Sequence, residues 1–144
     1  MAQTKPGKIE YVPPQLTAFP IIAIDPADRR EKLSASCCAE CKSLTFPPAP
    51  LCSKCGSQKV APAPLSEHGK LYSYSVLHVG ARGWPAPYVL GYVDLPEDVR
   101  VFSHIEGAPE ALRIDMAVSL QIREPIKNAE DQDVLAFAFR PSNL

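Results

Sequence analysis

In the second half of the chain, apolar and polar residues alternate with a period of two, which predicts β-strands. Between residues 71 and 79, Leu71 and every second residue after it point one way, whereas Tyr72, Tyr74 and Val76 point the other way. Four further strand candidates follow at residues 88–95, 99–105, 118–123 and 134–139. The pattern therefore predicts five short strands.

One short helical turn interrupts this series of strands. It is expected at residues 108–113, where Pro109 lies near its start, a position that suits proline because its φ is already helical. The turn falls between the third and the fourth strand. Five short strands with a helical turn at this point are typical of the five-stranded Greek-key barrel called the OB fold. We therefore expect a mainly β protein.

The first 36 residues follow a different pattern. Residues 1–24 form an extended arm in which four prolines separate short apolar stretches. Such a segment does not fold alone, so we expect it either to lie on the body of the protein or to dock against another surface. Asp25 suits the N-cap of a helix and Pro26 its first position, which predicts a short helix between Pro26 and Ser36.

Composition and charge exclude several classes of partner. The 16 prolines among 144 residues are about twice the average usage of roughly 5% and disfavour long helices. Lys plus Arg number 15 against 16 Asp plus Glu, so no basic excess attracts nucleic acid. The apolar runs are too short to cross a membrane, and the first residues lack the apolar segment of a secretory signal. We expect a cytoplasmic protein without a membrane or nucleic-acid partner.

All five cysteines lie between Cys37 and Cys55, too close together for the disulfide framework of a secreted domain. Two CxxC pairs, Cys38 with Cys41 and Cys52 with Cys55, are separated by ten residues. Four thiolates at this spacing indicate a tetrahedral Zn²⁺ site. Because four protein ligands leave no position for water, the predicted site is structural rather than catalytic.

Cys37 is the spare cysteine, and its CxxxC spacing to Cys41 makes it an alternative to Cys38. The two-residue spacing of the second pair favours Cys38. Gly56 follows the second pair and suits a positive φ in a turn around the metal. A redox CxxC would begin a helix in a βαβ setting, and no such pattern surrounds either pair. The chain thus divides into an N-terminal arm and helix at 1–36, a zinc ribbon at 37–60 and a barrel at 65–144.

No catalytic residue is predicted. The histidines His68, His78 and His104 have no nucleophile and acid at a recognisable spacing, so each is interpreted as a surface or cross-strand residue. An apolar loop after Gly83 contains the one tryptophan, which either folds onto the barrel or meets a partner. The candidate contacts to a partner or to coenzyme A are Arg82, Trp84 and Tyr88.

The order of a helix, a four-cysteine ribbon and a barrel resembles the rubredoxin-like zinc ribbon plus OB-fold family, once labelled a domain of unknown function. The resemblance covers residues 30–141. The residues that carry it are Cys38, Cys41, Phe46 to Pro48, Cys52 to Ser57, Gly69 to Val76, Pro87 to Leu95 and Phe139 to Pro141. The chain departs from the family at Lys42, where a glycine usually follows the first pair, and in its longer arm. The longer arm suggests an extra segment for holding a partner.

The resemblance implies a small accessory subunit without chemistry of its own. Members of the family bind thiolase-fold enzymes, or hydratase and dehydratase subunits, that act on acyl-CoA thioesters. One such complex cleaves an aromatic acylsuccinyl-CoA in anaerobic toluene degradation, and its small subunit also has a long arm. The resemblance therefore implies a hetero-oligomer in which a thiolase-like partner supplies the nucleophilic cysteine. The chain would cover or shape the active site and contact coenzyme A.

Two other classes of function compete with this one. OB folds and zinc ribbons also occur in single-stranded nucleic-acid-binding proteins, and Tyr72, Tyr74, Tyr88 and Tyr92 would supply surfaces on which bases stack. Against this, the tyrosines are flanked mainly by apolar and acidic residues, and the isoelectric point is about 6.3. An independent enzyme would need a nucleophile, a general base or an open metal position. We therefore favour the accessory subunit.

Overall fold

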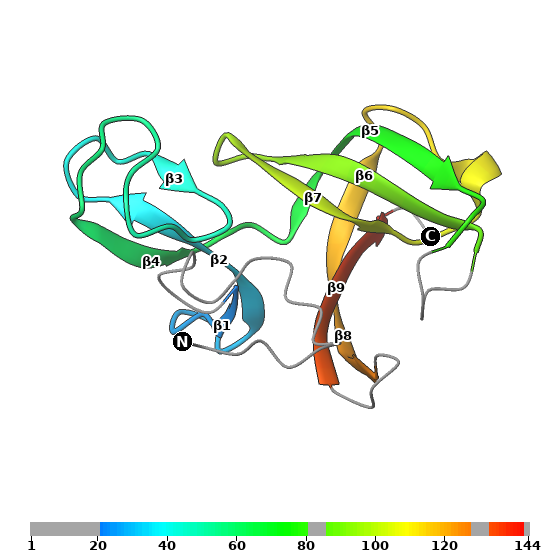
Figure 1. The fold of residues 1–144 in the computed structure, drawn as a ribbon, viewed down its shortest axis with the longest axis horizontal. Coiled ribbons are helices and arrows are strands. Elements are labelled where there is room, and N and C mark those ends of the chain that lie inside the picture. Colours follow the sequence, from blue (N-terminus) through cyan, green and yellow to red (C-terminus); the bar gives the residue numbers. More distant parts are fainter. Residues whose placement is uncertain (1–20, 81–85, 128–132, 143–144) are drawn as a thin grey trace.

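The structure is a computed structural model that describes residues 21–80, 86–127 and 133–142. The described strands form two parts, a small sheet near the N-terminus and a closed five-stranded barrel (Figure 1). Within these ranges no helix has the length and apolar content that a bilayer span requires.

The central strand of the small sheet is β2, which runs from Glu31 to Cys38. It pairs antiparallel with three neighbours. They are β1 (Ile22–Ile24), β3 (Leu44–Thr45) and β4 (Val60–Pro64). Four consecutive residues of β2, from Leu33 to Ser36, are buried, so both faces of this strand are covered.

The helix predicted between Pro26 and Ser36 is wrong. The carboxylate of Asp25 does accept a hydrogen bond from the amide of Ala27, at 2.9 Å, but this bond closes a turn rather than starting a helix. Arg29 then adopts a positive φ of 64°, and the chain reverses into β2. Pairing with β1 and β4 and burial of β2 therefore outweigh the local signal for a helix.

The last part of the predicted arm lies on the protein's own body. Ile22–Ile24 form β1 along the edge of β2. Residues 1–20 lie outside the described residues, so the docking interpretation of this segment stays a prediction.

The barrel consists of β5 (His68–Leu77), β6 (Tyr88–Leu95), β7 (Val99–Ile105), β8 (Ala117–Lys127) and β9 (Asp133–Pro141). The strands close in the order β5-β6-β7-β9-β8, and β5 pairs with β8 to complete the ring. All neighbours are antiparallel except β7 and β9. The 3-10 turn η2 (Pro109–Ala111) lies between β7 and β8. The predicted mainly β fold with an OB-type barrel is confirmed.

A bulge at Tyr72 changes which side chains of β5 face the core. Leu71 and Ser73 pair with consecutive residues of β6, so Tyr72 is an extra residue in the ladder. Leu71 is buried, and beyond the bulge Tyr74 and Val76 pack against the same core. The predicted division of residues 71–79 into two fixed faces is therefore wrong beyond Tyr72, because one extra residue exchanges the faces.

Gly91 lies where β6 closely approaches β5. A Cβ atom there would lie 2.6 Å from the carbonyl oxygen of Ser73 and 3.0 Å from Cγ1 of Ile105. Any side chain would therefore push the two strands apart, and only glycine lets them lie this close.

One apolar core extends from the small sheet into the barrel. The barrel contributes Leu71, Val89, Val93, Leu95, Val99, Val101, Ile105, Leu112, Val118, Leu120 and Phe139. Leu33 and Ala35 of β2, and Leu65 after β4, belong to the same cluster. The amide of Leu65 also donates a hydrogen bond to the carbonyl of Leu33, at 2.9 Å. The base of the small sheet is thus packed onto the barrel.

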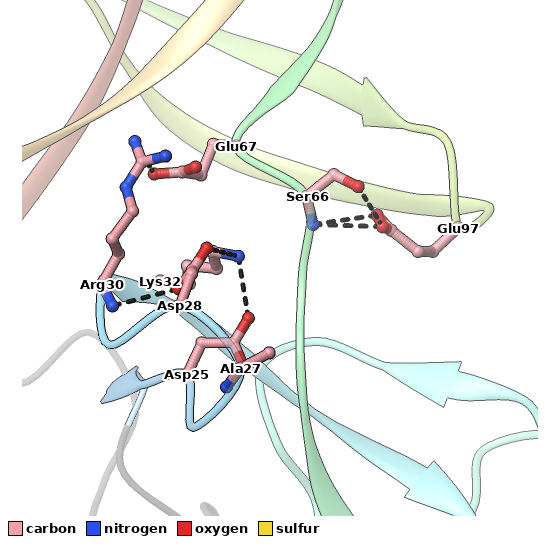
Figure 2. Close-up of polar contacts among 8 residues, drawn as sticks. All are labelled: Asp25, Ala27, Asp28, Arg30, Lys32, Ser66, Glu67 and Glu97. Carbon is pink, nitrogen blue, oxygen red and sulfur yellow. Dashed lines mark hydrogen bonds and ion pairs between the residues drawn. The ribbon is translucent and has the colours of Figure 1, made fainter.

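Polar contacts fix this joint as well (Figure 2). Glu97, in the turn between β6 and β7, accepts hydrogen bonds from Ser66 in the connection between β4 and β5. The amide of Ser66 lies 3.1 Å from each carboxylate oxygen, and its hydroxyl lies 2.7 Å from Oε2. Beside it, Arg30 and Glu67 form an ion pair at 2.8 Å. The connection between β4 and β5 is therefore bound both to the barrel, through Glu97, and to the turn before β2, through Arg30.

A second polar network holds the turn that leads into β2 (Figure 2). The ammonium group of Lys32 lies 2.8 Å from the carboxylate of Asp25 and 2.7 Å from that of Asp28. Asp25 is buried, and its second oxygen accepts the amide of Ala27. One cation thus stabilises both carboxylates of a turn that otherwise repel each other.

Candidate metal centre

Two turns of the same construction carry the paired cysteines. In the first, which follows β2, the carbonyl of Cys38 accepts a hydrogen bond from the amide of Lys42 at 3.0 Å. In the second, the carbonyl of Cys52 accepts one from the amide of Gly56 at 2.9 Å. Each CxxC pair therefore lies in a tight turn that points both of its sulfur atoms the same way.

The two turns bring four sulfur atoms into one cluster. Sγ of Cys38 lies 3.6 Å from Sγ of Cys55, and Sγ of Cys41 lies 3.4 Å from Sγ of Cys52. All four lie within 4.8 Å of one another. Ligands about 2.3 Å from a tetrahedral zinc ion would be about 3.8 Å apart. The cluster therefore has the donor atoms and the size that Zn²⁺ requires.

Backbone amides point at the two buried sulfur atoms. The amide of Cys41 lies 3.5 Å from Sγ of Cys38, and the amide of Lys54 lies 3.4 Å from Sγ of Cys52. Cys38 and Cys52 are buried, whereas Cys41 and Cys55 are exposed. The two sulfur atoms with least access to water therefore receive hydrogen bonds from the backbone.

Both turns use the left-handed backbone conformation at the same point. Gly56 has a φ of 76°, as its position after the second pair suggested. In the first turn the equivalent residue is Lys42, with a φ of 64°. A residue with a side chain adopts this conformation at a cost of about 1–2 kcal/mol. The replacement of the usual glycine therefore adds strain but leaves the shape of the turn unchanged.

The thiols of the cluster differ in acidity. The hydroxyl and amide of Ser43 are the main groups that lower the pKa of Cys41, to about 6. At Cys55 the amide of Ser57 acts to lower the pKa, but the neighbouring thiols and burial outweigh it and raise the pKa to about 12. In the absence of a cation, Cys55 therefore keeps its proton at neutral pH, because adjacent thiolates would repel each other. Metal binding at this cluster therefore releases protons.

Cys37 stands apart from the cluster. Its thiol donates to the carbonyl of Cys38 at 3.8 Å, and it is not among the four residues whose sulfur atoms converge. Of the two cysteines that the spacing left open for the first ligand position, the structure brings Cys38 to the site.

The other predicted contact residues are only partly described. Arg82 and Trp84 lie outside the described residues. Tyr88 is the first residue of β6, and its ring centroid lies 5.6 Å from that of His104 on β7. Burial lowers the pKa of His104. The other two histidines lie at the two ends of β5, so the described structure forms no histidine cluster.

The four tyrosines proposed as a stacking surface do not lie on one face. Tyr72 and Tyr92 are exposed on the outside of the barrel. Tyr74 instead packs against the core, and its hydroxyl donates to the carbonyl of Leu112 at 3.1 Å. Phe102, which the sequence analysis did not single out, is exposed beside Tyr92. Phe102 alternates with the buried residues Val101 and Ser103 along β7, and this alternation is the sequence pattern that places Phe102 on the outside of the barrel.

Comparison with known proteins identifies the family. Residues 27–61 match the ChsH2 rubredoxin-like zinc ribbon domain, and residues 63–123 match the ChsH2 C-terminal OB-fold domain. Over 142 residues the chain is 37% identical to the benzoylsuccinyl-CoA thiolase subunit BbsA of Thauera aromatica. The match covers 97% of this chain and 99% of that protein. The chain belongs to the ChsH2 zinc ribbon and OB-fold family. The resemblance noted in the sequence is confirmed.

The chain is also similar to another curated protein and to a solved structure. A probable enoyl-CoA hydratase alpha subunit of Thermomonospora curvata is 32% identical over 118 residues, which are 81% of this chain and 35% of that protein. A chain of the solved structure called Ltp2-ChsH2(DUF35) aldolase is 34% identical, with a TM-score of 0.66, and the match covers 77% of this chain and 85% of that chain. The ribbon and barrel thus follow an experimentally known arrangement.

Proposed function

We propose that this ChsH2-family protein is a non-catalytic accessory subunit that binds a thiolase-fold or hydratase subunit and supports the conversion of an acyl-CoA thioester. The observation that carries this proposal is the 37% identity to a thiolase subunit over 97% of the chain. A relationship over nearly the full length of both proteins includes the ribbon, the barrel and the connection between them. It therefore supports a shared mode of assembly.

In this subunit Cys38, Cys41, Cys52 and Cys55 hold a Zn²⁺ ion. The observed cluster of four sulfur atoms within 4.8 Å supports this assignment. When bound, the ion cross-links the two cysteine turns and stabilises them. Four thiolates complete the tetrahedral shell and leave no position for water or substrate, so the role of the ion is structural.

The substrate of the complex is a coenzyme A thioester, and the partner supplies the nucleophilic cysteine. The relationship to BbsA, a benzoylsuccinyl-CoA thiolase subunit, supports thiolytic cleavage of an aromatic acylsuccinyl-CoA as the reaction. Arg82, Trp84 and Tyr88 are the proposed contacts to the partner or to coenzyme A. We place the complex in the cytoplasm, where cysteine thiols stay reduced and available to a metal.

The proposal is tested by isolating the native protein from its own cells and identifying the associated proteins by mass spectrometry. We expect a thiolase-fold or hydratase subunit, and we expect its acyl-CoA turnover to fall when this chain is removed. Recovery of nucleic acid and nucleic-acid enzymes alone would instead favour a single-strand binder.

A further inference from the structure

Three aromatic side chains form an exposed surface on the outside of the barrel wall made by β5, β6 and β7. We call it the aromatic face, and it consists of Tyr72, Tyr92 and Phe102. These residues are 48%, 44% and 54% exposed. Three rings about half exposed present on the order of 300 Å² of surface. A patch of that size approaches the largest that a typical monomer exposes, and such patches are often functional.

The rings of the aromatic face are held in place by the strands. Tyr92 and Phe102 are directly opposite each other across β6 and β7, and their ring centroids are 5.0 Å apart. Tyr72 is the extra residue of the β5 bulge, and the guanidinium of Arg100 lies 3.5 Å from its ring centroid. Rings fixed in this way lose little conformational freedom on binding, so the surface is already arranged for a partner.

The charged groups of this wall gather at one end of the aromatic face. Asp94 accepts two hydrogen bonds from Arg100, at 2.6 and 3.1 Å, and Lys70 stands opposite Asp94 on β5. These three groups leave one net positive charge. The exposed arginines Arg123 and Arg140 lie instead on β8 and β9.

This distribution of charge favours a protein over a nucleic acid as the occupant of the aromatic face. A single-strand binder combines stacking rings with a groove of several cations along the phosphate backbone. Here a single net charge stands beside uncharged rings. The well-packed centre of a protein interface is enriched in aromatic residues and arginine and depleted of other charged residues. The aromatic face has this composition.

We propose that the aromatic face is the docking surface for the acyl-CoA-converting subunit, which covers it with an uncharged apolar patch and places an acidic group at the end formed by Lys70 and Arg100. This inference rests on the proposed function and adds the surface through which the chain binds its partner. A stable interface takes about 800 Å² from each partner. The aromatic face is therefore the centre of a larger contact.

The test is a Tyr92→Ser, Phe102→Ser double variant measured in complex with the acyl-CoA-converting subunit that co-purifies with the wild type. Both positions point to solvent, so we expect the substitutions to leave the barrel core intact, and thermal unfolding together with zinc content checks this. Loss of an interface hot spot weakens binding roughly 30-fold or more, so we expect at least that increase in Kd. Ile114→Ser is the matched control, because Ile114 is 55% exposed in the loop after η2 and is not part of the face.

Three other outcomes would each contradict one or both proposals. If the wild type forms the complex and the double variant binds equally well, the docking surface is wrong while the proposed function stands. If the wild type binds no acyl-CoA-converting subunit, both proposals fail. If the wild type binds a fluorescent single-stranded oligonucleotide and the double variant does not, the occupant is a nucleic acid and the docking proposal is overturned.

Discussion

The cysteine turns and the barrel are stabilised by different means. Of residues 37–60, only Cys38, Pro48 and Cys52 are buried, so two of the three buried side chains are thiols of the metal site. The barrel instead buries a continuous set of aliphatic side chains around Phe139. A segment that buries so little apolar surface gains little from the hydrophobic effect. The turns therefore depend on a metal ion, whereas the barrel depends on its core.

The part of the molecule that is stabilised by the apolar core does not end where the barrel meets the ribbon. Leu33 of β2 and Leu65 after β4 are part of the barrel core, and Glu97 binds Ser66 across the joint. The base of the ribbon is thus stabilised with the barrel. Only the end of the ribbon that carries the cysteines relies on the ion. This end reaches from Cys37 to Lys59, and we call it the ribbon tip.

Removal of one metal ligand should have the largest effect. In a Cys52→Ser variant we expect loss of bound zinc and of ordered structure in the ribbon tip, because structural zinc contributes about 10–16 kcal/mol in zinc-finger peptides. The barrel should remain folded. Metal analysis and hydrogen exchange resolved by peptide measure both effects. A Cys37→Ser control should keep one zinc ion, and a tip that stays protected without metal would contradict the account.

The converse experiment weakens the core and spares the tip. Phe139 is fully buried, so Phe139→Ala should lower the free energy of unfolding by about 3–5 kcal/mol. While the protein remains folded, its zinc content should not change. Urea unfolding with parallel metal analysis checks this prediction. Zinc loss from folded Phe139→Ala protein would show that the two regions are not separable.

A smaller effect is expected at the joint. Glu97 accepts hydrogen bonds from both the amide and the hydroxyl of Ser66, and Glu97→Gln removes the charge that strengthens them. We expect a loss of about 1 kcal/mol in the free energy of unfolding and faster hydrogen exchange at Ser66. Asp98→Asn in the same turn is the control. Unchanged exchange at Ser66 would mean that apolar packing alone fixes the joint.

The smallest predicted effect depends on pH. The ammonium of Lys32, followed by the amide of Ala27, lowers the pKa of Asp25 below its ordinary value of 3.8. A carboxyl group with a lowered pKa stabilises the folded state above its unfolded pKa and loses this contribution as the pH falls through its folded pKa. Asp25→Asn should therefore be less stable than the wild type at pH 7, and the difference should vanish in acid. Thermal unfolding between pH 2 and 7 measures it, and a difference that persists below both pKa values would implicate the turn geometry instead.

The parts of the fold that the sequence predicted are those set by local pattern. The bounds of β6 and β7 match the predicted residues 88–95 and 99–105, because alternation there is unbroken and a turn separates the strands. The four sulfur atoms converge because two CxxC turns impose the same local geometry. Both features join segments that lie near each other in the sequence.

What the sequence did not predict depends on partners far along the chain. Asp25 and Pro26 suggested a helix, but pairing with β4, some thirty residues later, made the segment a strand. The bulge at Tyr72 has no local signal, and it redirected Tyr74 into the core. The first feature arises from strand pairing within the small sheet and the second from the closed barrel, so no local pattern contains them.

The most direct test of the accessory-subunit account is acyl-CoA turnover by the purified partner subunit as this chain is added. We expect little turnover by either protein alone and a rise that saturates at a fixed molar ratio of the two. Turnover by the partner that is independent of this chain, or turnover by this chain alone, would contradict it.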